Sequence, residues 1–268
     1  ALGSRIEMNM GAGPTPDTLL FDLRVDWQER RRWLRLLVDL HLRAGFATAE
    51  TQFGYLERPA HANTSWEQAK FEFAAHRWID VSEANGGMSL VNDGMYGHSF
   101  EGSQVGLSLL RSPAHSHPRA PHPPYTFPGE EEHFTDQGRQ HFQWMLVAHD
   151  GSWREGATLA MADALNGAPI LVEGADDLIP DIRIPQGVGL EALKVAEDGD
   201  GYVLRLVDQI GARRTSQITL PARITSVEPV DLLEDPTEAC SAWTFDAKAH
   251  TLRVTIGPFE LVTFKLRV

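Results

Sequence analysis

The chain has 268 residues, 42% of them hydrophobic, so it is long and apolar enough to bury the core of one large or two smaller domains. Its formal net charge is -13 and its pI is about 5.2, so it offers no electrostatic attraction to phosphate backbones or anionic lipid headgroups. We therefore expect neither a nucleic-acid partner nor a membrane partner.

Three features of the sequence bear on its location in the cell. The single cysteine, Cys240, excludes an intrachain disulfide. The first residues, up to Met8, lack the apolar stretch of a signal peptide, and the longest apolar runs are much shorter than the roughly 20 residues of a membrane helix. Together these features predict a cytoplasmic protein.

Alternation of apolar and polar residues predicts β-strands along most of the chain. Residues 20–27 have one apolar and one polar face, whereas both faces of residues 32–41 are largely apolar, as in a strand between two packed sheets; a buried helix is the alternative there. Only residues 158–165 favour a helix. Many short strands without long helices between them predict an all-β sandwich architecture. The remaining predicted strands are 49–56, 70–81, 88–92, 105–110, 139–148, 190–195, 202–208, 215–220, 251–256 and 261–268.

Two irregular segments interrupt the strand pattern. Residues 112–132 contain six prolines, which cannot donate to a strand ladder, and predict a long exposed loop. Residues 174–189 contain two prolines and several glycines, and the strand pattern resumes after them. We therefore place a domain boundary near Gly187, which gives a first domain of residues 1–187 and a second of residues 188–268.

Eight short phrases resemble, in the same order, the region downstream of the catalytic domain in glycoside hydrolase family 38 α-mannosidases of the cytosolic and bacterial type. Each phrase alone is weakly specific, but together they extend over nearly the whole chain. They are VDWQER at 25–30, QFGYLERP at 52–59, HANTSWE at 61–67, HRWIDVSE at 76–83, LVNDGMYG at 90–97, LSLLRSP at 107–113, DQGRQHF at 136–142 and GPFEL at 257–261.

This resemblance implies a fold for the chain and a catalytic domain outside it. The implied fold is a galactose mutarotase-like β-supersandwich followed by a smaller β-sandwich from about Val188. The parent enzyme is implied to be a retaining exo-α-mannosidase that uses zinc, held by His and Asp side chains, and an Asp nucleophile. All of these lie upstream, in a catalytic domain outside this chain. The chain begins where the family is already inside its β region, so we expect the first strands of the sandwich to lie upstream too.

We assign no catalytic residue and no metal ligand in this chain. Retaining hydrolysis needs two carboxyl groups about 5 to 5.5 Å apart, and none of the 37 acidic residues can be given either role. Zinc is expected in the upstream domain only, and the chain alone is predicted to be inactive. His115, His117, His122 and His133, near Glu130–Glu132, are ligand types for a divalent metal, but their proline-rich surroundings favour a solvated loop.

Five residues are candidates for contact with the substrate cleft. Asn92, Asp93 and Tyr96 lie in a stretch that approaches the cleft in the family, although Asn-Asp-Gly is also a common turn signature. His61 and Asn63 lie in a loop between strands. The competing interpretation of that loop is a helix cap at Thr64 or Ser65, completed as a capping box by Glu67.

Two further residues of the family phrases are given no functional role. Trp78, near His76 and Arg77, has a ring of the kind that stacks on sugars, but the alternation of residues 70–81 favours an ordinary strand. His141 lies one position later than the histidine of the family, where Gln140 stands here.

The leading interpretation is a non-catalytic module of an α-mannosidase that supports the catalytic domain and lends loops to the substrate cleft. Its expected partners are the catalytic domain of the same polypeptide and mannosides. The alternatives are a stand-alone carbohydrate-binding or mutarotase-like protein, and an interaction module that forms a homo-oligomer.

Overall fold

The computed structural model describes residues 3–114, 133–167, 182–238 and 242–268. It divides into two compact units. The first unit comprises Ala1–Thr51 and Tyr55–Ala168, and the second comprises Pro169–Val268 together with Gln52–Gly54. The chain is all-β in architecture, with a large region of several sheets followed by a smaller β-sandwich, as the sequence predicts.

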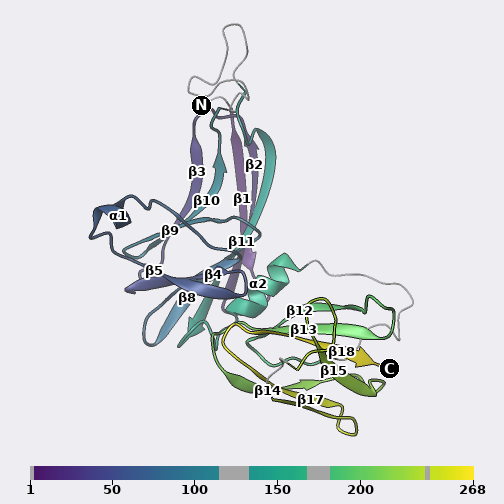
Figure 1. The fold of residues 1–268 in the computed structure, drawn as a ribbon. Helices are drawn as coiled ribbons and strands as arrows, with labels where there is room; N and C mark the ends of the chain where they lie inside the picture. The colour runs from purple at the N-terminus through teal and green to yellow at the C-terminus, as the bar shows by residue number, and fades with distance from the viewer. Residues whose placement is uncertain (1–2, 115–132, 168–181, 239–241) are drawn as a thin grey trace. The chain divides into compact units, whose positions relative to one another are not determined.

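A seven-stranded sheet forms the larger layer of the first unit (Figure 1). Its longest strand, β11, pairs antiparallel with β2 on one side and β8 on the other, so segments far apart in the sequence lie side by side. In spatial order the strands are β1 (Arg5–Ala12), β2 (Thr18–Trp27), β11 (Gly138–Asp150), β8 (Gly86–Asn92), β7 (Trp78–Ser82), β4 (Phe46–Thr51) and β5 (Gly54–Pro59).

A four-stranded sheet packs on one face of the larger sheet. Its order is β3 (Trp33–Asp39), β10 (Gln104–Arg111), β9 (Gly97–Glu101) and β6 (Phe73–Ala74). Two clusters of apolar side chains fill the layer between the sheets, because alternate residues of each strand point to that side. One cluster contains Leu23, Val25, Trp27, Leu110 and Trp144, and the other contains Ala47, Ala49, Ala75, Ile79, Val81, Leu90, Phe100, Val105 and Leu107.

The edge strand β1 leaves an apolar row uncovered. Ile6, Met8 and Met10 pair in register with Val25, Leu23 and Phe21 of β2, so they continue the apolar face of the sheet. Their exposed fractions are nevertheless 52%, 56% and 66%. Contiguous apolar rows on an exposed sheet edge are uncommon in globular proteins, and where they occur they often mark a contact with another domain or protein.

Helix α2 (Thr158–Asn166) covers part of the opposite face of the seven-stranded sheet, against β8 and β11. Its buried residues Leu159, Met161 and Ala162 face the sheet. The hydroxyl groups of Thr158 and Ser89 lie 2.7 Å apart and join the helix to β8. This helix matches the predicted one at residues 158–165.

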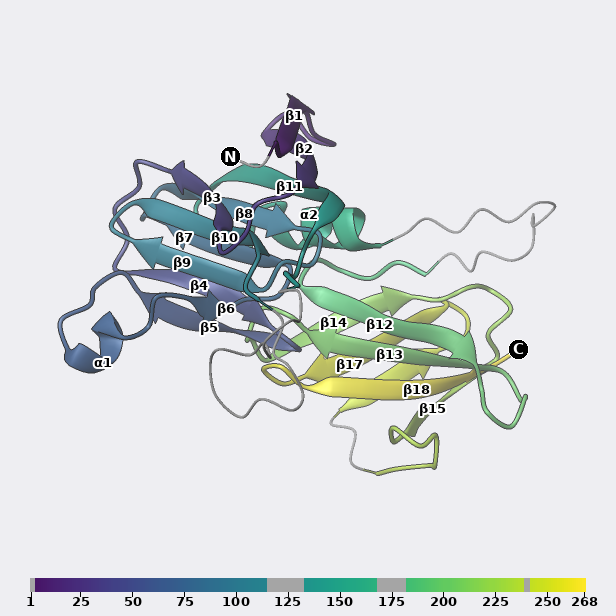
Figure 2. The same ribbon diagram turned by 90° about the horizontal axis from the view of Figure 1, so that it is seen from above.

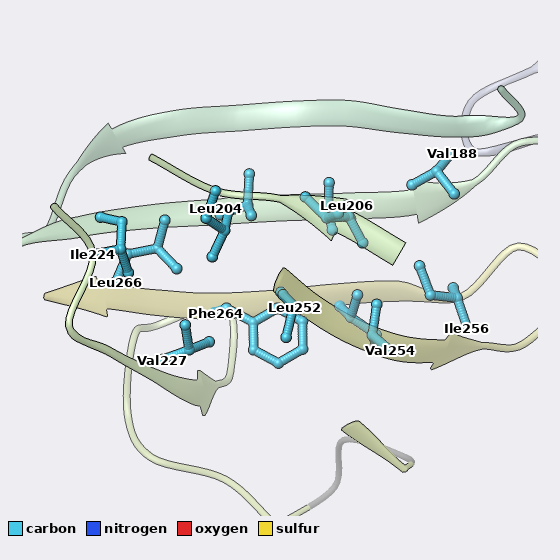
Figure 3. Packing of buried hydrophobic residues seen from close by; sticks show 13 residues of the cluster. Val188, Leu204, Leu206, Ile224, Val227, Leu252, Val254, Ile256, Phe264 and Leu266 are labelled. Atoms are coloured by element: carbon cyan, nitrogen blue, oxygen red, sulfur yellow. The ribbon is translucent and has the colours of Figure 1, made fainter. Parts of the chain in front are cut away.

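The second unit is a sandwich of two sheets. One sheet has the order β12 (Val188–Val195), β13 (Tyr202–Asp208), β18 (Leu261–Arg267) and β15 (Ser226–Val230), and the other β14 (Arg214–Thr219), β17 (Thr251–Ile256) and β16 (Trp243–Asp246). Figure 3 shows Leu204 and Phe264 from one sheet meeting Leu252 and Val254 from the other. Each such fully buried side chain contributes about 2 kcal/mol through the hydrophobic effect.

Two predicted strands are wrong as single elements. Residues 49–56 form parts of β4 and β5, separated by a turn at Phe53, whose φ of 58° is left-handed. Residues 70–81 contain β6 and β7, which belong to different sheets. The chain changes sheet at His76, because the backbone N–H groups of His76 and Arg77 donate to the carbonyl and carboxylate of Glu50, at 2.9 and 2.7 Å. The other predicted strands are confirmed, and β1, β9, β15 and β16 were not predicted.

Several predictions fall outside the described residues. They are the proline-rich loop at 115–132 with His115, His117 and His122, and the irregular segment at 174–181. The domain boundary near Gly187 stays a prediction. Within the described ranges, no helix is long and apolar enough to cross a membrane.

Candidate functional site at the carboxyl end of β8

The turn that follows β8 is organised by Asn92, whose side chain is fully buried. Its Oδ1 accepts the N–H groups of Gly94 and Met95 at 2.9 and 2.7 Å, which is the geometry of an Asx-type turn. Its Nδ2 donates to the carbonyl of His76 at 3.2 Å. The amide of Asn92 is therefore occupied in shaping the turn, and substrate contact by this residue stays a prediction.

His98 fixes the far end of the same turn. Nδ1 of its ring lies 3.3 Å from the carbonyl of Tyr96, and Nε2 lies 3.3 Å from Nδ2 of Asn92. A neutral ring that donates from Nδ1 and accepts at Nε2 satisfies both partners. Burial lowers the pKa of His98 to about 4, so this neutral form persists at physiological pH.

The segment before β7 is held by a buried ion pair. Glu50 accepts hydrogen bonds from Nε and Nη2 of Arg77, the shortest at 2.6 Å, and Asp163 of α2 accepts one from Nη1 at 2.6 Å. Burial opposes the charged guanidinium, but the hydrogen bonds and charges of Glu50 and Asp163 outweigh it and raise the pKa of Arg77. Arg77 therefore joins β4, β7 and α2 at one point.

Tyr96 is the exposed aromatic residue of the turn. Its ring stacks on that of His76, with centroids 5.5 Å apart and an interplanar angle of 21°. Nδ1 of His76 lies 3.6 Å from the Glu50 carboxylate. Tyr96 is 52% exposed, so one side of a firmly backed ring faces solvent.

Asp93 leads from the turn to a group of polar residues on the face of the sheet. Its Oδ2 accepts the backbone N–H of Gln143 at 2.8 Å, and Nε2 of Gln143 donates to Oδ2 of Asp22 at 3.1 Å. Nε2 of His141 lies 2.6 Å from the same Asp22 oxygen. Asp22, His141 and Gln143 were missed as site residues, although their place on the polar face of alternating strands was available from the sequence.

The two carboxyl groups of this polar group differ in acidity. The hydrogen bond with His141 lowers the pKa of Asp22, with Gln143 acting in the same direction. Burial raises the pKa of Asp93, although the N–H of Gln143 opposes that shift. Neighbouring groups whose pKa values are displaced in opposite directions are typical of functional surfaces.

His61 and Asn63 lie elsewhere in the first unit. Thr64 caps the short helix α1 (Ser65–Gln68), and the Glu67 side chain accepts the N–H groups of Thr64 and Asn63, so the predicted capping box is confirmed. His61 lies beside the same Glu67 carboxylate, at 3.6 Å. Figures 1 and 2 both show α1 well apart from α2, the helix whose Asn166 donates to the carbonyl of Asn92 at 3.0 Å. The structure does not bring His61 and Asn63 together with the candidates of the turn at Asn92.

Trp78 has a structural place. It is buried, and its ring packs on that of Trp153 at a centroid distance of 4.6 Å. This agrees with the structural role expected from the sequence.

A zinc site would need several His, Cys, Asp or Glu side chains around one point. Among the described residues, no three such side chains are grouped so that they could hold a metal ion. The described residues therefore do not provide the ligand set of a zinc centre.

The fold defines an all-β chain with a multi-sheet region and a smaller sandwich, and the candidate side chains lie at a strand end and on a sheet face. Residues 3–119 match the family described as "Glycosyl hydrolases family 38 C-terminal domain", and residues 187–264 match "Glycosyl hydrolases family 38 C-terminal beta sandwich domain". The chain belongs to the carboxyl-terminal region of glycosyl hydrolase family 38, and the resemblance found in its sequence is confirmed.

Similar proteins are whole enzymes several times longer. Alpha-mannosidase G of Dictyostelium discoideum is 32% identical over 91% of this chain, and Alpha-mannosidase 2C1 of Homo sapiens is 34% identical over 92%. These matches cover 22% and 23% of the two relatives, so the chain spans less than a quarter of their length. The crystal structure of an alpha-mannosidase from Enterococcus faecalis V583 has the same fold over 97% of this chain and 28% of that one, with a TM-score of 0.73 and 17% identity.

Proposed function

We propose that this chain is a non-catalytic module of a retaining exo-α-mannosidase that removes terminal α-mannose residues from oligosaccharides. In this role it supports a catalytic domain of the same polypeptide, and the turn from Asn92 to Tyr96 lends side chains to the substrate cleft. The observation that carries the proposal is the match to curated alpha-mannosidases over more than 90% of this chain but less than a quarter of their length.

The uncovered row on β1 supports the part of the proposal that concerns a neighbouring domain. Ile6, Met8 and Met10 extend an apolar sheet face beyond its own partner sheet. The relatives supply the remaining three quarters of an enzyme, and a domain of that enzyme is the occupant that we assign to this row. Met8→Asp is expected to weaken retention of the catalytic domain when the two parts are expressed separately, and Glu7→Gln on the other face of β1 is the control.

The turn from Asn92 to Tyr96 supports the part of the proposal that concerns the substrate cleft. Tyr96 presents a half-exposed ring backed by His76, and the nearby Asp93 is partly exposed. Rings and carboxylates of this kind bind pyranoses and their hydroxyl groups.

The cleft role is tested in the longer enzyme that contains this chain. Tyr96→Ala and Asp93→Ala are expected to raise KM for an oligomannoside or lower kcat, while the midpoint of thermal unfolding stays nearly unchanged for Tyr96→Ala. An effect on stability alone, with the same kcat and KM, contradicts the cleft role. Trp66→Ala, an 81% exposed aromatic residue on α1, is the matched control for Tyr96.

The absence of catalysis by this chain is a separate proposal. Purified chain with added zinc is expected to leave 4-nitrophenyl α-D-mannopyranoside intact, because neither a nucleophile nor a zinc centre has been assigned to it. Release of nitrophenol above the uncatalysed rate would overturn the non-catalytic assignment. Zinc is proposed to belong to the catalytic domain of the parent enzyme.

A mutarotase-like sugar-binding protein is the second candidate. It is favoured by the grouping of an imidazole and two carboxyl groups, His141 with Asp22 and Asp93, on one sheet face. Proton transfer at a sugar ring needs such an acid and base. Polarimetry of freshly dissolved sugar separates the candidates, since only a mutarotase accelerates the change in rotation. A cytoplasmic location and a homo-oligomer stay predictions, tested by fractionation and size-exclusion chromatography.

A further inference from the structure

A cavity of about 360 Å³ lies at one end of the sandwich of the second unit. This volume is within the range of small-molecule binding sites. One wall of the cavity is the four-stranded sheet, to which β12 contributes Leu193 and Val195, β13 contributes Tyr202 and β18 contributes Leu266. The described residues that line the cavity all belong to the second unit, so the cavity is a feature of that unit by itself.

Leu193 and Val195 point toward the inside of the sandwich but remain in contact with solvent. Their register partners on β13 are Leu204 and Tyr202, which pack in the core of the second unit. Residues directly opposite each other on neighbouring strands point to the same face, so all four side chains lie on the inner face. Leu193 and Val195 are nevertheless 37% and 60% exposed. The inner face of β12 is therefore open at this end, and a ligand can enter the cavity from solvent.

The opposite wall of the cavity is built from two segments that backbone hydrogen bonds hold in place. Ile182 lies next to Arg183, which exchanges two backbone hydrogen bonds with Thr219 of β14, both at 3.1 Å. The N–H of Ile224 donates to the carbonyl of Pro221 at 3.0 Å and so closes the turn between them. Ile224 is buried at one end of the core (Figure 3). The cavity is therefore preformed in the fold.

The charged side chains of the cavity favour an anionic ligand. Lys194 and Arg223 line it, whereas no Asp or Glu is among its described lining residues. Nζ of Lys194 is held by the carboxylates of Glu197 and Glu234, which offset its charge. The guanidinium of Arg223 lies over the ring of Tyr202, 5.9 Å from its centroid, and so stays at the wall of the cavity. Because a guanidinium carries five N–H donors, Arg223 can bind an anion in addition to its other partners.

We infer that this cavity binds a small amphiphilic anion, whose apolar body lies between the sheet and Ile224 and whose negative group lies beside Arg223. An aromatic or branched aliphatic carboxylate or sulfonate has these properties. The apolar walls bind the body through the hydrophobic effect, and the guanidinium binds the charge. A neutral sugar, which presents hydroxyl groups on all sides, is not the expected ligand. The site is independent of the mannoside-binding role proposed for the first unit.

The test is a fluorescence titration of the 268-residue chain with 8-anilinonaphthalene-1-sulfonate, which has an aromatic body and a single negative charge. A saturable rise in fluorescence is expected. Val195→Asp places a carboxylate at the exposed side of the cavity and is expected to weaken binding about tenfold, because the two negative charges repel each other. Arg223→Gln removes the positive charge and is expected to weaken binding several-fold. N-phenyl-1-naphthylamine has the same body without the sulfonate, so it should bind equally to the Arg223→Gln variant and to the unchanged chain.

Leu190→Asp is the matched control, because Leu190 is another exposed apolar residue of β12 but does not line the cavity. Met8→Asp tests the apolar row on β1, a second surface to which the dye could bind. Both variants are expected to bind the dye as the unchanged chain does. No saturable rise in fluorescence, unchanged affinity in Val195→Asp, or loss of binding in Met8→Asp would overturn the inference. Equal weakening of both dyes by Arg223→Gln would show that Arg223 does not bind the negative group, which would overturn it too.

Discussion

Nε2 of His149 on β11 lies 2.7 Å from Oδ1 of Asp80 on β7, and both side chains are almost completely buried. Ser82 and Ser89 donate to the same carboxylate at 2.5 and 2.7 Å, and Ser89 also meets Thr158 of α2. This network joins two strands that are not neighbours in the sheet to the helix that covers it. It therefore supports the same region of the first unit as the candidate site.

Replacing His149 is expected to change both the stability of the first unit and its pH dependence. Burial disfavours the charged ring, but Asp80 and Asp150 outweigh this and raise the pKa of His149 above its ordinary value. The pair therefore stabilises the fold fully below about pH 6.5, and this contribution is lost as the pH rises through the raised pKa. His149→Ala leaves a buried carboxylate without its partner and is expected to cost about 3 kcal/mol, measured by urea unfolding at pH 6.

His149→Gln separates titration from packing. Its amide can still donate to Asp80 but cannot take up a proton, so the fall in stability above pH 6.5 is expected to flatten. His61→Gln, at an exposed histidine beside Glu67, is the control and should retain the slope of the unchanged chain. An unchanged slope in His149→Gln contradicts the assignment.

His98 is expected to affect the pH dependence of stability in the opposite direction, so that stability is lost towards acidic pH. Because burial lowers its pKa to about 4, the unfolded chain binds a proton between about pH 6.5 and 4 that the folded chain does not, so stability is lost as the pH falls. The displacement corresponds to about 3 kcal/mol. His98→Asn, which can donate to the Tyr96 carbonyl without titrating, should lose less stability than the unchanged chain over that range; parallel curves would refute the prediction.

The sequence predicts the strands of this fold better than the places where the chain changes sheet. Residues 202–208 and 251–256 coincide with β13 and β17, because β17 alternates in burial and β13 is a short apolar run that is buried along most of its length. The break inside residues 70–81 depends on Glu50, which lies more than 20 residues away and captures the backbone of His76 and Arg77. A contact of that range has no signal in a local pattern.

The residues of the candidate site also differ in how well the sequence predicts them. The turn at Asn92 is visible in the sequence because Asn-Asp-Gly has its own turn chemistry. Asp22 and Gln143 are 121 positions apart and meet only through the register of β2 and β11. Each has the alternation of an ordinary solvent-facing strand residue, so pairing of the strands is needed to identify them as neighbours.

The ion pair of Arg77 provides a comparison of a buried and an exposed partner. Glu50→Gln is expected to destabilise the first unit by about 2 kcal/mol, because it removes the charge opposite a largely buried guanidinium. Asp163→Asn should cost less than about 1 kcal/mol, since Asp163 is 58% exposed. Urea unfolding of both variants measures the difference. Equal costs would show that the burial of the acidic partner does not determine the strength of its ion pair with Arg77.

Asp208 is expected to determine the stability of the second unit. Its buried Oδ2 accepts the backbone N–H groups of Gly211, Ala212 and Phe259 at 2.7, 3.0 and 3.2 Å, and so closes the loops at the ends of β13 and β17. Asp208→Ala leaves these donors without their acceptor and is expected to cost about 3 kcal/mol.

Asp208→Asn keeps one oxygen that can accept the same N–H groups and is the matched control, with a smaller expected loss of stability.

Six of the seven tryptophans lie in the first unit, so tryptophan fluorescence reports mainly on that unit. Hydrogen exchange at Leu204 and Leu206 in the core of the second unit is the appropriate measurement. Faster exchange is expected there in Asp208→Ala, because the loops that Asp208 closes bound the strands of that core. Exchange as slow in Asp208→Ala as in the unchanged chain would mean that the three hydrogen bonds contribute nothing to the stability of the sandwich.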